Sequence, residues 1–388
     1  MNHQTREYLK GRFRDYYRTA DIHQPPEVHR RELGYIPWTE GDETVMVRHK
    51  SQMNIGSIGT HLKENAPQHM YYSAAYYQDP GRKGGMQNKN LQQADLIFDI
   101  DADHLDGVTA QTGKKEALAE AKEHLKQLIT YVEEDFGFTD YQIVFSGNRG
   151  YHLHVRDSGV MDLGRKARQE IVDYVQANGL NIDGLVEKRY SNGTTTRCVR
   201  NKGGWGKRLY SAFLDHMEGV VELEKKEAVE ALSAYDNVGE KRARTAYKNF
   251  TDPNELIKSG VIEAAGVGAR KIFKQFAEQK VPDLAVEIDA PVTTDLHRLI
   301  RLPETIHGGS GLLTTTVDKG DLNSFSPLSD AIPERFVGRN IEINVQEPAE
   351  IFLNDEQKTI EKGNQSVEEY IGIYLMANGM AEKQSGLL

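Results

Sequence analysis

The chain has 388 residues, 38% of them hydrophobic and 27% charged, so it is long enough for two or three compact units and too apolar for general disorder. Its single cysteine, Cys198, excludes an intramolecular disulfide and a cysteine-rich metal site. No apolar run reaches the roughly 20 residues that cross a bilayer, and the first residues carry charges where a signal peptide is apolar. We therefore expect a cytoplasmic protein without membrane segments. Because the net charge is −10, nucleic acid would have to meet a local basic surface or metal ions.

The first half of the chain predicts strands around one long helix. Residues 29–38 indicate a turn, and residues 43–52 a strand. The aromatic segment 70–80 ends in a Pro80-Gly81 turn. Apolar spacing over 116–136 predicts a helix between strands at 95–101 and 141–146, and the GNRG turn leads to a third strand at 151–155. This order predicts an α/β (α+β) fold with a mixed sheet and helical cover.

The second half predicts an inserted helical region and a return to the first unit. Residues 209–283 are helical in pattern and highly charged, strands are expected at 285–292 and 311–318, and a helix is expected at 366–383. We therefore assign residues 1–208 and 284–350 to an α/β core, 209–283 to an inserted helical subdomain, and 351–388 to a C-terminal helical segment packed on the core.

Two carboxylates stand on one face of the strand in DLIFDIDADHLD (95–106). Asp99 and Asp101 are two positions apart, so their Cα atoms lie ~6.6 Å apart on the same side. Their repulsion is offset if a hard cation such as Mg²⁺ or Mn²⁺ binds. The alternative is a solvated acidic loop after an edge strand. The motif also occurs in metal-dependent glycosyltransferases and in aspartyl-nucleophile phosphatases, although Ala102-Asp103 departs from the phosphatase pattern.

The turn in FSGNRGYHLH (145–154) indicates a phosphate-binding site. Its glycines free backbone N–H groups, while Ser146, Arg149 and His152 add side-chain donors. The alternative is an ordinary hairpin with a solvent-facing arginine. His152 and His154 are spaced as zinc ligands would be, but no third ligand supports zinc.

A third segment combines an acid with cations. VEIDAPVTTDLHRLIRLPETIHGGSG (286–311) carries Asp289 in a predicted strand, then His297, Arg298 and Arg301 in a helical turn, and His307 in a glycine-rich loop. An acid with several cationic donors is what a metal–triphosphate complex requires.

Taken in this order, the three segments resemble the catalytic small subunit of archaeal and eukaryotic DNA primase, and the likeness is closest to the archaeal members. It extends from about Glu27 to Asp318, because HRRELGYIPW, MVRH and YYSAAYYQDPG also look like segments of that family. The resemblance implies primer synthesis on single-stranded DNA from nucleoside triphosphates with two Mg²⁺ or Mn²⁺ ions. It also implies a heterodimer with a large subunit that carries an iron–sulfur cluster.

The resemblance assigns roles residue by residue. It implies metal-binding catalytic aspartates at Asp99, Asp101 and Asp289. The triphosphate-binding residues it implies are Ser146, Arg149, His152, Arg301 and His307, and further nucleotide-site residues are Arg31, Glu32 and Arg48. Many relatives carry a zinc knuckle after the first motif, but residues 102–145 contain no cysteine, so we expect no zinc in this chain. Asn148 stands where relatives carry a further basic residue.

Template contact is predicted for the basic stretch 187–208, which contains a tryptophan and several glycines. The residues concerned are Arg197, Arg200, Trp205, Lys207 and Arg208. The alternative is an exposed, flexible basic loop. Two rival functions remain open at this point, a metal-dependent aspartyl phosphatase and a catalytically silent nucleic-acid-binding relative.

Overall fold

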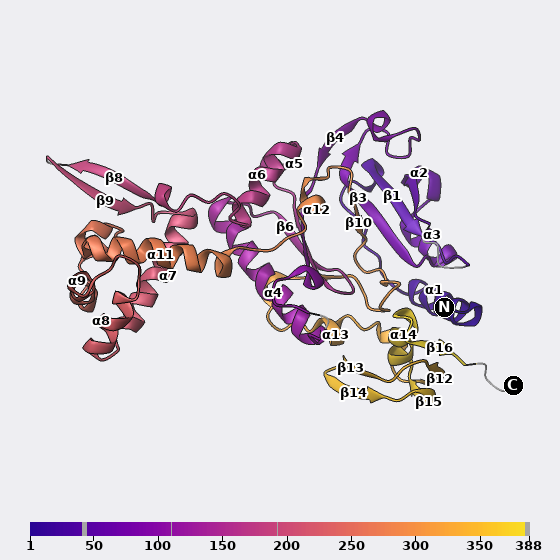
Figure 1. Cartoon of the computed structure of the whole chain (residues 1–388). Coiled ribbons are helices and arrows are strands. Elements are labelled where there is room, and N and C mark those ends of the chain that lie inside the picture. Colours follow the sequence, from indigo (N-terminus) through magenta and orange to yellow (C-terminus); the bar gives the residue numbers. More distant parts are fainter. Residues whose placement is uncertain (41–44, 110, 192, 385–388) are drawn as a thin grey trace. The chain divides into compact units, whose positions relative to one another are not determined.

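The computed structural model describes residues 1–40, 45–109, 111–191 and 193–384, and its chain divides into two compact units (Figure 1). Unit 1 comprises residues 1–126, 139–172 and 287–388, and unit 2 comprises residues 127–138 and 173–286. With 44% helix and 22% strand, the predicted α+β class is confirmed. Among the described residues, no helix is both long and apolar enough to span a bilayer.

The first sheet of unit 1 is antiparallel, with strand order β10-β3-β1-β2 and with β4 also paired to β3. The aromatic strand β3 and its neighbour β1 are buried almost throughout, and the two charged residues that begin β1, Arg31 and Glu32, are buried in ion pairs. Its strands are β1 (Arg31–Ile36), β2 (Val47–Lys50), β3 (His69–Tyr77), β4 (Leu91–Ala94) and β10 (Leu299–Arg301).

The second sheet has the order β11-β6-β7-β5 and carries the DxD motif on its edge strand β5. Its strands are β5 (Leu96–Asp101), β6 (Tyr141–Phe145), β7 (Gly150–Val155) and β11 (Thr315–Val317). The structure differs here from the predicted mixed sheet, because every pairing between described strands is antiparallel. The helix α4 (Lys114–Thr130) connects β5 to β6, and these two strands do run in the same direction. However, β7 lies between them in the sheet, so they do not pair with each other.

A small apolar cluster joins the two sheets. Ala74 of β3, Ile97 of β5, Ile300 of β10 and Val292 of the short helix α12 (Ala290–Thr294) are all at most 4% exposed and pack together. Burial of such side chains stabilises a fold by roughly 1.5–3 kcal/mol each. The cluster therefore fixes the acid-bearing strand β5 beside the basic strand β10.

The predicted strand at 285–292 is wrong. Residues 285–289 are extended without a strand partner, and α12 begins at the next residue. Pro291, in the first turn of α12, explains the difference, because its fixed φ favours a helix start and its missing N–H disfavours a sheet ladder. The predicted helical turn at 297–301 is instead a bend that leads into β10.

The C-terminal part of unit 1 is also less helical than predicted. The expected helix at 366–383 is confined to α14 (Glu369–Ala377), which the strands β15 (Gly363–Glu368) and β16 (Ala381–Lys383) flank. Both strands pair with β12 (Asn340–Val345), and β13 (Ala349–Leu353) pairs with β14 (Glu356–Ile360). Gly379, at φ +77, ends the helical stretch because only glycine adopts this backbone conformation without strain.

The remaining helices of unit 1 are mostly short. The N-terminal helix α1 packs against α14, since Arg12 pairs with the buried carboxylate of Glu369 at 2.9 Å. The helices are α1 (His3–Tyr17), α2 (Gln52–Ile55), α3 (Ile58–Asn65), α5 (Ser158–Met161) and α13 (Pro327–Asp330), together with α6 (Arg165–Val175), whose last three residues belong to unit 2.

Unit 2 is a helical bundle with one hairpin (Figure 1). Phe213, Phe250 and Phe273 pack edge to face in its core. As a compact unit it comprises residues 127–138 and 173–286, which include the helical region predicted at 209–283. The predicted boundaries, taken as functional domains, stay a prediction. Its elements are β8 (Val186–Ser191), β9 (Thr194–Val199), α7 (Gly204–Val221), α8 (Lys225–Ser233), α9 (Glu240–Thr251), α10 (Glu255–Lys258) and α11 (Val267–Leu284).

Candidate functional site

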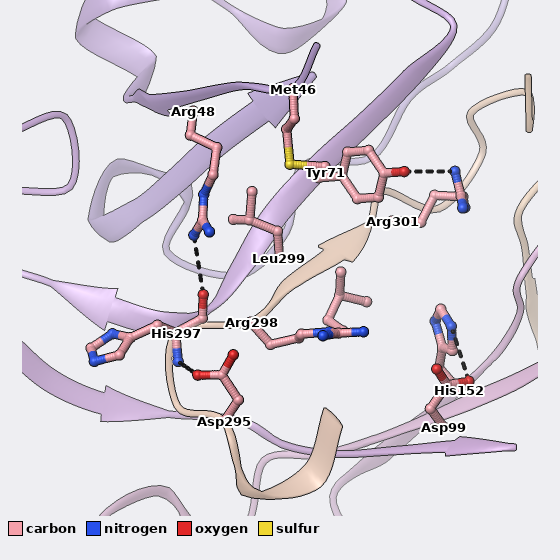
Figure 2. Close-up of a pocket in the computed structure, with 11 residues that line it drawn as sticks. Met46, Arg48, Tyr71, Asp99, His152, Asp295, His297, Arg298, Leu299 and Arg301 are labelled. Carbon is pink, nitrogen blue, oxygen red and sulfur yellow. Dashed lines mark hydrogen bonds and ion pairs between the residues drawn. The ribbon is translucent and has the colours of Figure 1, made fainter. Parts of the chain in front are cut away.

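A cavity of about 440 Å³ opens in unit 1 where the basic strand β10 faces the acidic strand β5. Figure 2 shows the side chains around it, with Arg298 between Arg48 and Arg301 and with Asp99 beside His152. Four residues predicted for the site line this cavity: Arg48, Asp99, His152 and Arg301.

The three predicted metal ligands come together around β5. Asp99 and Asp101 lie on this strand, and the backbone N–H of Asp289 donates to the carbonyl oxygen of Asp99 at 2.9 Å. Asp289 directly precedes α12, and the contact of that helix with β5 holds it in place. The structure therefore unites acids that are far apart in the sequence.

The negative charge of the Asp99 carboxylate is only partly balanced by nearby positive charge. Burial raises the pKa of Asp99 above its ordinary value, and the charges of Asp101 and Asp289 act in the same direction. His152 opposes them from β7, where its Nε2 lies 3.5 Å from an Asp99 oxygen. Burial in turn lowers the pKa of His152. An added cation would relieve this concentration of negative charge.

The glycine turn lies next to the acids. The hydroxyl of Ser146 accepts a hydrogen bond from the Gly150 N–H at 3.2 Å, which closes the turn. Gly150 is required here, because a Cβ would stand 1.8 Å from the carbonyl oxygen of Ile100 in the neighbouring strand. Arg149 is exposed and forms an ion pair with Asp103, so its guanidinium lies beside the acidic strand.

His307 connects the turn to the basic strand. A Cβ on Gly147, which has φ +84, would lie 2.8 Å from the Cβ of His307, so the glycine permits this approach. The His307 ring packs against His69, to which Arg301 hydrogen-bonds. Burial, then the charge of Arg301, lowers the pKa of His307 well below its ordinary value.

Two further cations lie at this site: Lys114, which the sequence analysis did not name, and Arg298, which it named only among the cationic donors of the third segment. The Nζ of Lys114 donates to Asn148 at 2.8 Å, so a cation reaches the turn position where we expected only an uncharged residue. Burial, followed by the nearby Arg149, lowers the pKa of Lys114 to about 8, although Asp103 opposes the shift. Arg298 extends across the cavity in Figure 2 and acts electrostatically on Asp99. Its place in the HRLIR stretch was visible in the sequence, whereas Lys114 gave no local signal.

The predicted further nucleotide-site residues divide between two places. Arg48 lines the cavity and forms an ion pair with the buried Glu32 at 3.2 Å. Glu32 also forms an ion pair with Lys89, at 2.6 Å. Arg31 is fully buried elsewhere, where it pairs with Asp95 at 3.0 Å and donates to the Ala74 carbonyl oxygen at 2.8 Å. The structure therefore brings Arg48 into the cavity and leaves Arg31 outside it.

The residues predicted for template contact lie in unit 2, and several have structural partners there. Arg197 pairs with Glu263 at 2.9 Å and Arg200 with Glu187 at 3.2 Å. Lys207 and Arg208 pair with Glu134 and Asp135 at 2.8 and 3.0 Å. Trp205 is only 4% exposed and donates to a backbone carbonyl, so its indole has no free face for a base. The predicted flexible loop is thus a hairpin followed by the first turn of α7.

The donor set suits a metal that is shared with a substrate. Among the described residues, no three His, Cys, Asp or Glu side chains stand close enough to enclose an ion by themselves. Mg²⁺, however, typically takes one or two carboxylates from a protein and completes its shell with water and substrate phosphates. Burial and the charges of Asp101 and Asp289 raise the pKa of Asp99 although His152 and Arg298 oppose them, so a bound cation would stabilise the ionised carboxylate.

Acids on one strand and cations on the facing strand, with a glycine turn at their side, define an enzyme that acts on phosphorylated substrates. Comparison with known proteins identifies the family. A family model described as "DNA primase small subunit" matches residues 98–318. The DNA primase small subunit PriS of Halorubrum lacusprofundi is 46% identical over 384 residues, which cover 99% of either chain. The proteins of the same name from Halobacterium salinarum and Methanococcoides burtonii are 42% and 37% identical, over 99% and 98% of this chain and 99% of each relative.

The chain belongs to the DNA primase small subunit family. It is a catalytic primase subunit, a nucleotidyltransferase that synthesises primers, and the family implies catalysis with divalent metal. The predicted family and enzyme class are confirmed. The two alternative functions, an aspartyl phosphatase and a catalytically silent relative, receive no support from these comparisons. The name "small subunit" also implies a large-subunit partner.

Proposed function

We propose that Asp99, Asp101 and Asp289 together bind two Mg²⁺ or Mn²⁺ ions and that primer synthesis on single-stranded DNA takes place at these acids. The observation that carries the proposal is the 2.9 Å hydrogen bond from the Asp289 N–H to the Asp99 carbonyl oxygen, which brings the third acid to the strand of the other two. Bound divalent ions supply activation of a 3′-hydroxyl and charge neutralisation at the triphosphate.

The cations of the site bind the triphosphate in this proposal. Arg301, Arg298 and Arg48 line the cavity, and Lys114 and Arg149 lie at the glycine turn, where they contact Asn148 and Asp103. Guanidinium groups suit phosphate oxygens because they donate two parallel hydrogen bonds. Two buried atoms, the Nδ1 of His152 and the Nε of Arg301, have no hydrogen-bond partner among the described residues, which supports a bound ligand at this place.

The partners of the proposal are a single-stranded DNA template, nucleoside triphosphates and a primase large subunit in a heterodimer. A cytoplasmic location and the lack of zinc in this chain remain predictions from the sequence.

A template-dependent primer-synthesis assay tests the proposal. Wild-type protein with its large subunit, Mg²⁺ or Mn²⁺ and a single-stranded template should make short products, and Asp289→Asn should reduce the rate by about 100-fold or more. Asp106→Asn is the matched control, because Asp106 is exposed and lies in the same acidic stretch outside the proposed trio. Synthesis by Asp289→Asn at the wild-type rate would remove this residue from the site.

A further inference from the structure

The helical unit contains a cavity of about 340 Å³ that is strongly cationic. It lies between the β8–β9 hairpin, which contributes Lys188 and Arg197, and α11, which contributes Arg270, Lys271 and Lys274. Asp183 is the one acid among the side chains that line it. We call this cavity, with the five cationic side chains that line it, the hairpin cavity. Such a concentration of positive charge stands out in a chain whose net charge is −10.

The acids near the hairpin cavity neutralise only part of this charge. Lys274 pairs with Asp183 at 2.8 Å, and Arg197 pairs with Glu263 at 2.9 Å. Lys271 donates only to a backbone carbonyl oxygen, at 3.2 Å. Within the described part of the chain, Lys188 and Arg270 have no ion-pair partner. Three of the five cations therefore lack an acid and are available to an anion.

The register of the hairpin places like charges opposite each other. Lys188 pairs directly with Arg197 across the two strands. Like charges at this position destabilise an antiparallel pair, and a bound anion removes the penalty. The opposite face of the hairpin differs, because Glu187 there pairs with both Arg189 and Arg200. On that face two cations thus share one acid, whereas five cations and a single lining acid surround the hairpin cavity, so the larger surplus of positive charge lies there.

An exposed aromatic ring continues this face. Tyr190 follows Lys188 by two residues in β8, so the two side chains lie on the same side of the strand. Tyr190 is 77% exposed, which is unusual for a large aromatic side chain. A cationic surface with an exposed aromatic ring is the combination that binds a single strand, with phosphates on the cations and a base on the ring.

We propose that the hairpin cavity and Tyr190 bind the backbone and one base of single-stranded nucleic acid. The choice of a single strand rests on the proposed function, and the site lies within unit 2, outside the residues proposed for catalysis. An acidic peptide would satisfy the cations equally well but would make no use of the exposed ring, so the single strand is favoured.

Fluorescence anisotropy with a labelled oligo(dT) strand tests the proposal on the full chain, without nucleotide or divalent metal. Lys188→Glu/Arg270→Glu should weaken binding by at least about tenfold at 0.05 M salt, and should reduce the slope of log K against log salt by roughly 0.7 for each cation removed. Tyr190→Ala should weaken binding about fivefold or more. The matched control is Lys225→Glu/Lys226→Glu, which makes the same charge change at an exposed helix start in the same unit. Circular dichroism verifies that all variants are folded.

The outcomes separate this proposal from the catalytic one. Equal weakening by the cavity variant and the control variant overturns the assignment, because only net charge would then matter. Displacement of the labelled strand by polyglutamate as readily as by oligo(dT), at equal charge concentration, overturns the choice of a single strand. Asp106→Asn, outside both the hairpin cavity and the proposed catalytic acids, should bind the strand as the wild type does. If the proposed catalytic acids prove wrong, this binding result is unaffected.

Discussion

Asp289 donates its backbone N–H to the carbonyl oxygen of Asp99 at 2.9 Å, although the two residues belong to distant parts of the sequence. The bond attaches the segment before α12 to the acidic strand, and the apolar cluster of Ala74, Ile97, Val292 and Ile300 supports it from behind. The position of the third acid therefore depends on packing between two sheets and not on local sequence.

Gly150 controls how closely the glycine turn approaches the acids. Gly150→Ala should lower both stability and primer synthesis, because the new Cβ would meet the Ile100 carbonyl oxygen at 1.8 Å and would push β7 away from β5. Overpacking of this kind costs about 1–3 kcal/mol of unfolding free energy. Denaturant unfolding and a primer-synthesis assay measure the two effects.

The control for this prediction is Gly159→Ala. A Cβ at Gly159 would meet no atom within 4 Å, and the residue lies in the short helix α5, so stability and synthesis should be unchanged or slightly raised. An equally stable and active Gly150→Ala variant would show that β5 and β7 do not need this close contact.

Arg31 and Arg48 should separate stability from nucleotide binding. Arg31→Met leaves the buried carboxylate of Asp95 with Arg156, at 3.3 Å, as its one cationic partner among the described residues, so we expect a loss of about 3 kcal/mol of unfolding free energy. The KM for nucleotide should stay near its wild-type value. Denaturant unfolding and steady-state kinetics provide both numbers.

Arg48→Ala should act mainly on nucleotide binding. Arg48 lines the cavity, so its loss should raise the KM for nucleotide about tenfold. Because the buried Glu32 keeps Lys89 at 2.6 Å, the loss of unfolding free energy should be smaller than that of Arg31→Met. If Arg31→Met raised KM as strongly as Arg48→Ala while the protein stayed fully folded, Arg31 would have to be counted among the nucleotide-binding residues.

Lys114 should make nucleotide binding sensitive to pH. Burial lowers its pKa to about 8, and a bound triphosphate should raise this pKa, so binding takes up a proton. Affinity should therefore fall as pH rises through about 8, by up to roughly tenfold between pH 7 and pH 9. Nucleotide dissociation constants measured over this range test the prediction.

Two variants calibrate the pH dependence. Lys114→Arg stays charged throughout the range and should lose the pH dependence while it keeps most of the affinity. Lys114→Met should bind weakly at every pH. A Lys114→Met protein with the same decline in affinity as the wild type would assign the titration to another group.

The sequence alone predicted those features of the structure that a few neighbouring residues determine. The two-residue spacing of Asp99 and Asp101 predicted a common face, and the GNRG residues predicted the tight turn that joins β6 to β7. The fold class followed from the order of strands and helix in the same way. Each of these properties is decided within a few residues.

Tertiary packing decided the features that the sequence did not reveal. The insertion of β7 between β5 and β6 replaced the expected mixed sheet with antiparallel pairs. Trp205 stood in a basic, glycine-rich stretch that predicts exposure, but the start of α7 buries it against Tyr131. Lys114 reaches the glycine turn only because α4 begins beside it, and no spacing in the sequence indicates that contact.

The central claim is that Asp99, Asp101 and Asp289 act as one metal-binding group. Electron paramagnetic resonance of Mn²⁺, titrated into the protein with and without nucleoside triphosphate, measures this binding directly. Asp101→Asn and Asp289→Asn should each weaken Mn²⁺ binding by about tenfold or more, whereas Asp106→Asn should bind as the wild type does. Wild-type Mn²⁺ affinity in the Asp289→Asn protein, with and without nucleotide, would contradict the account.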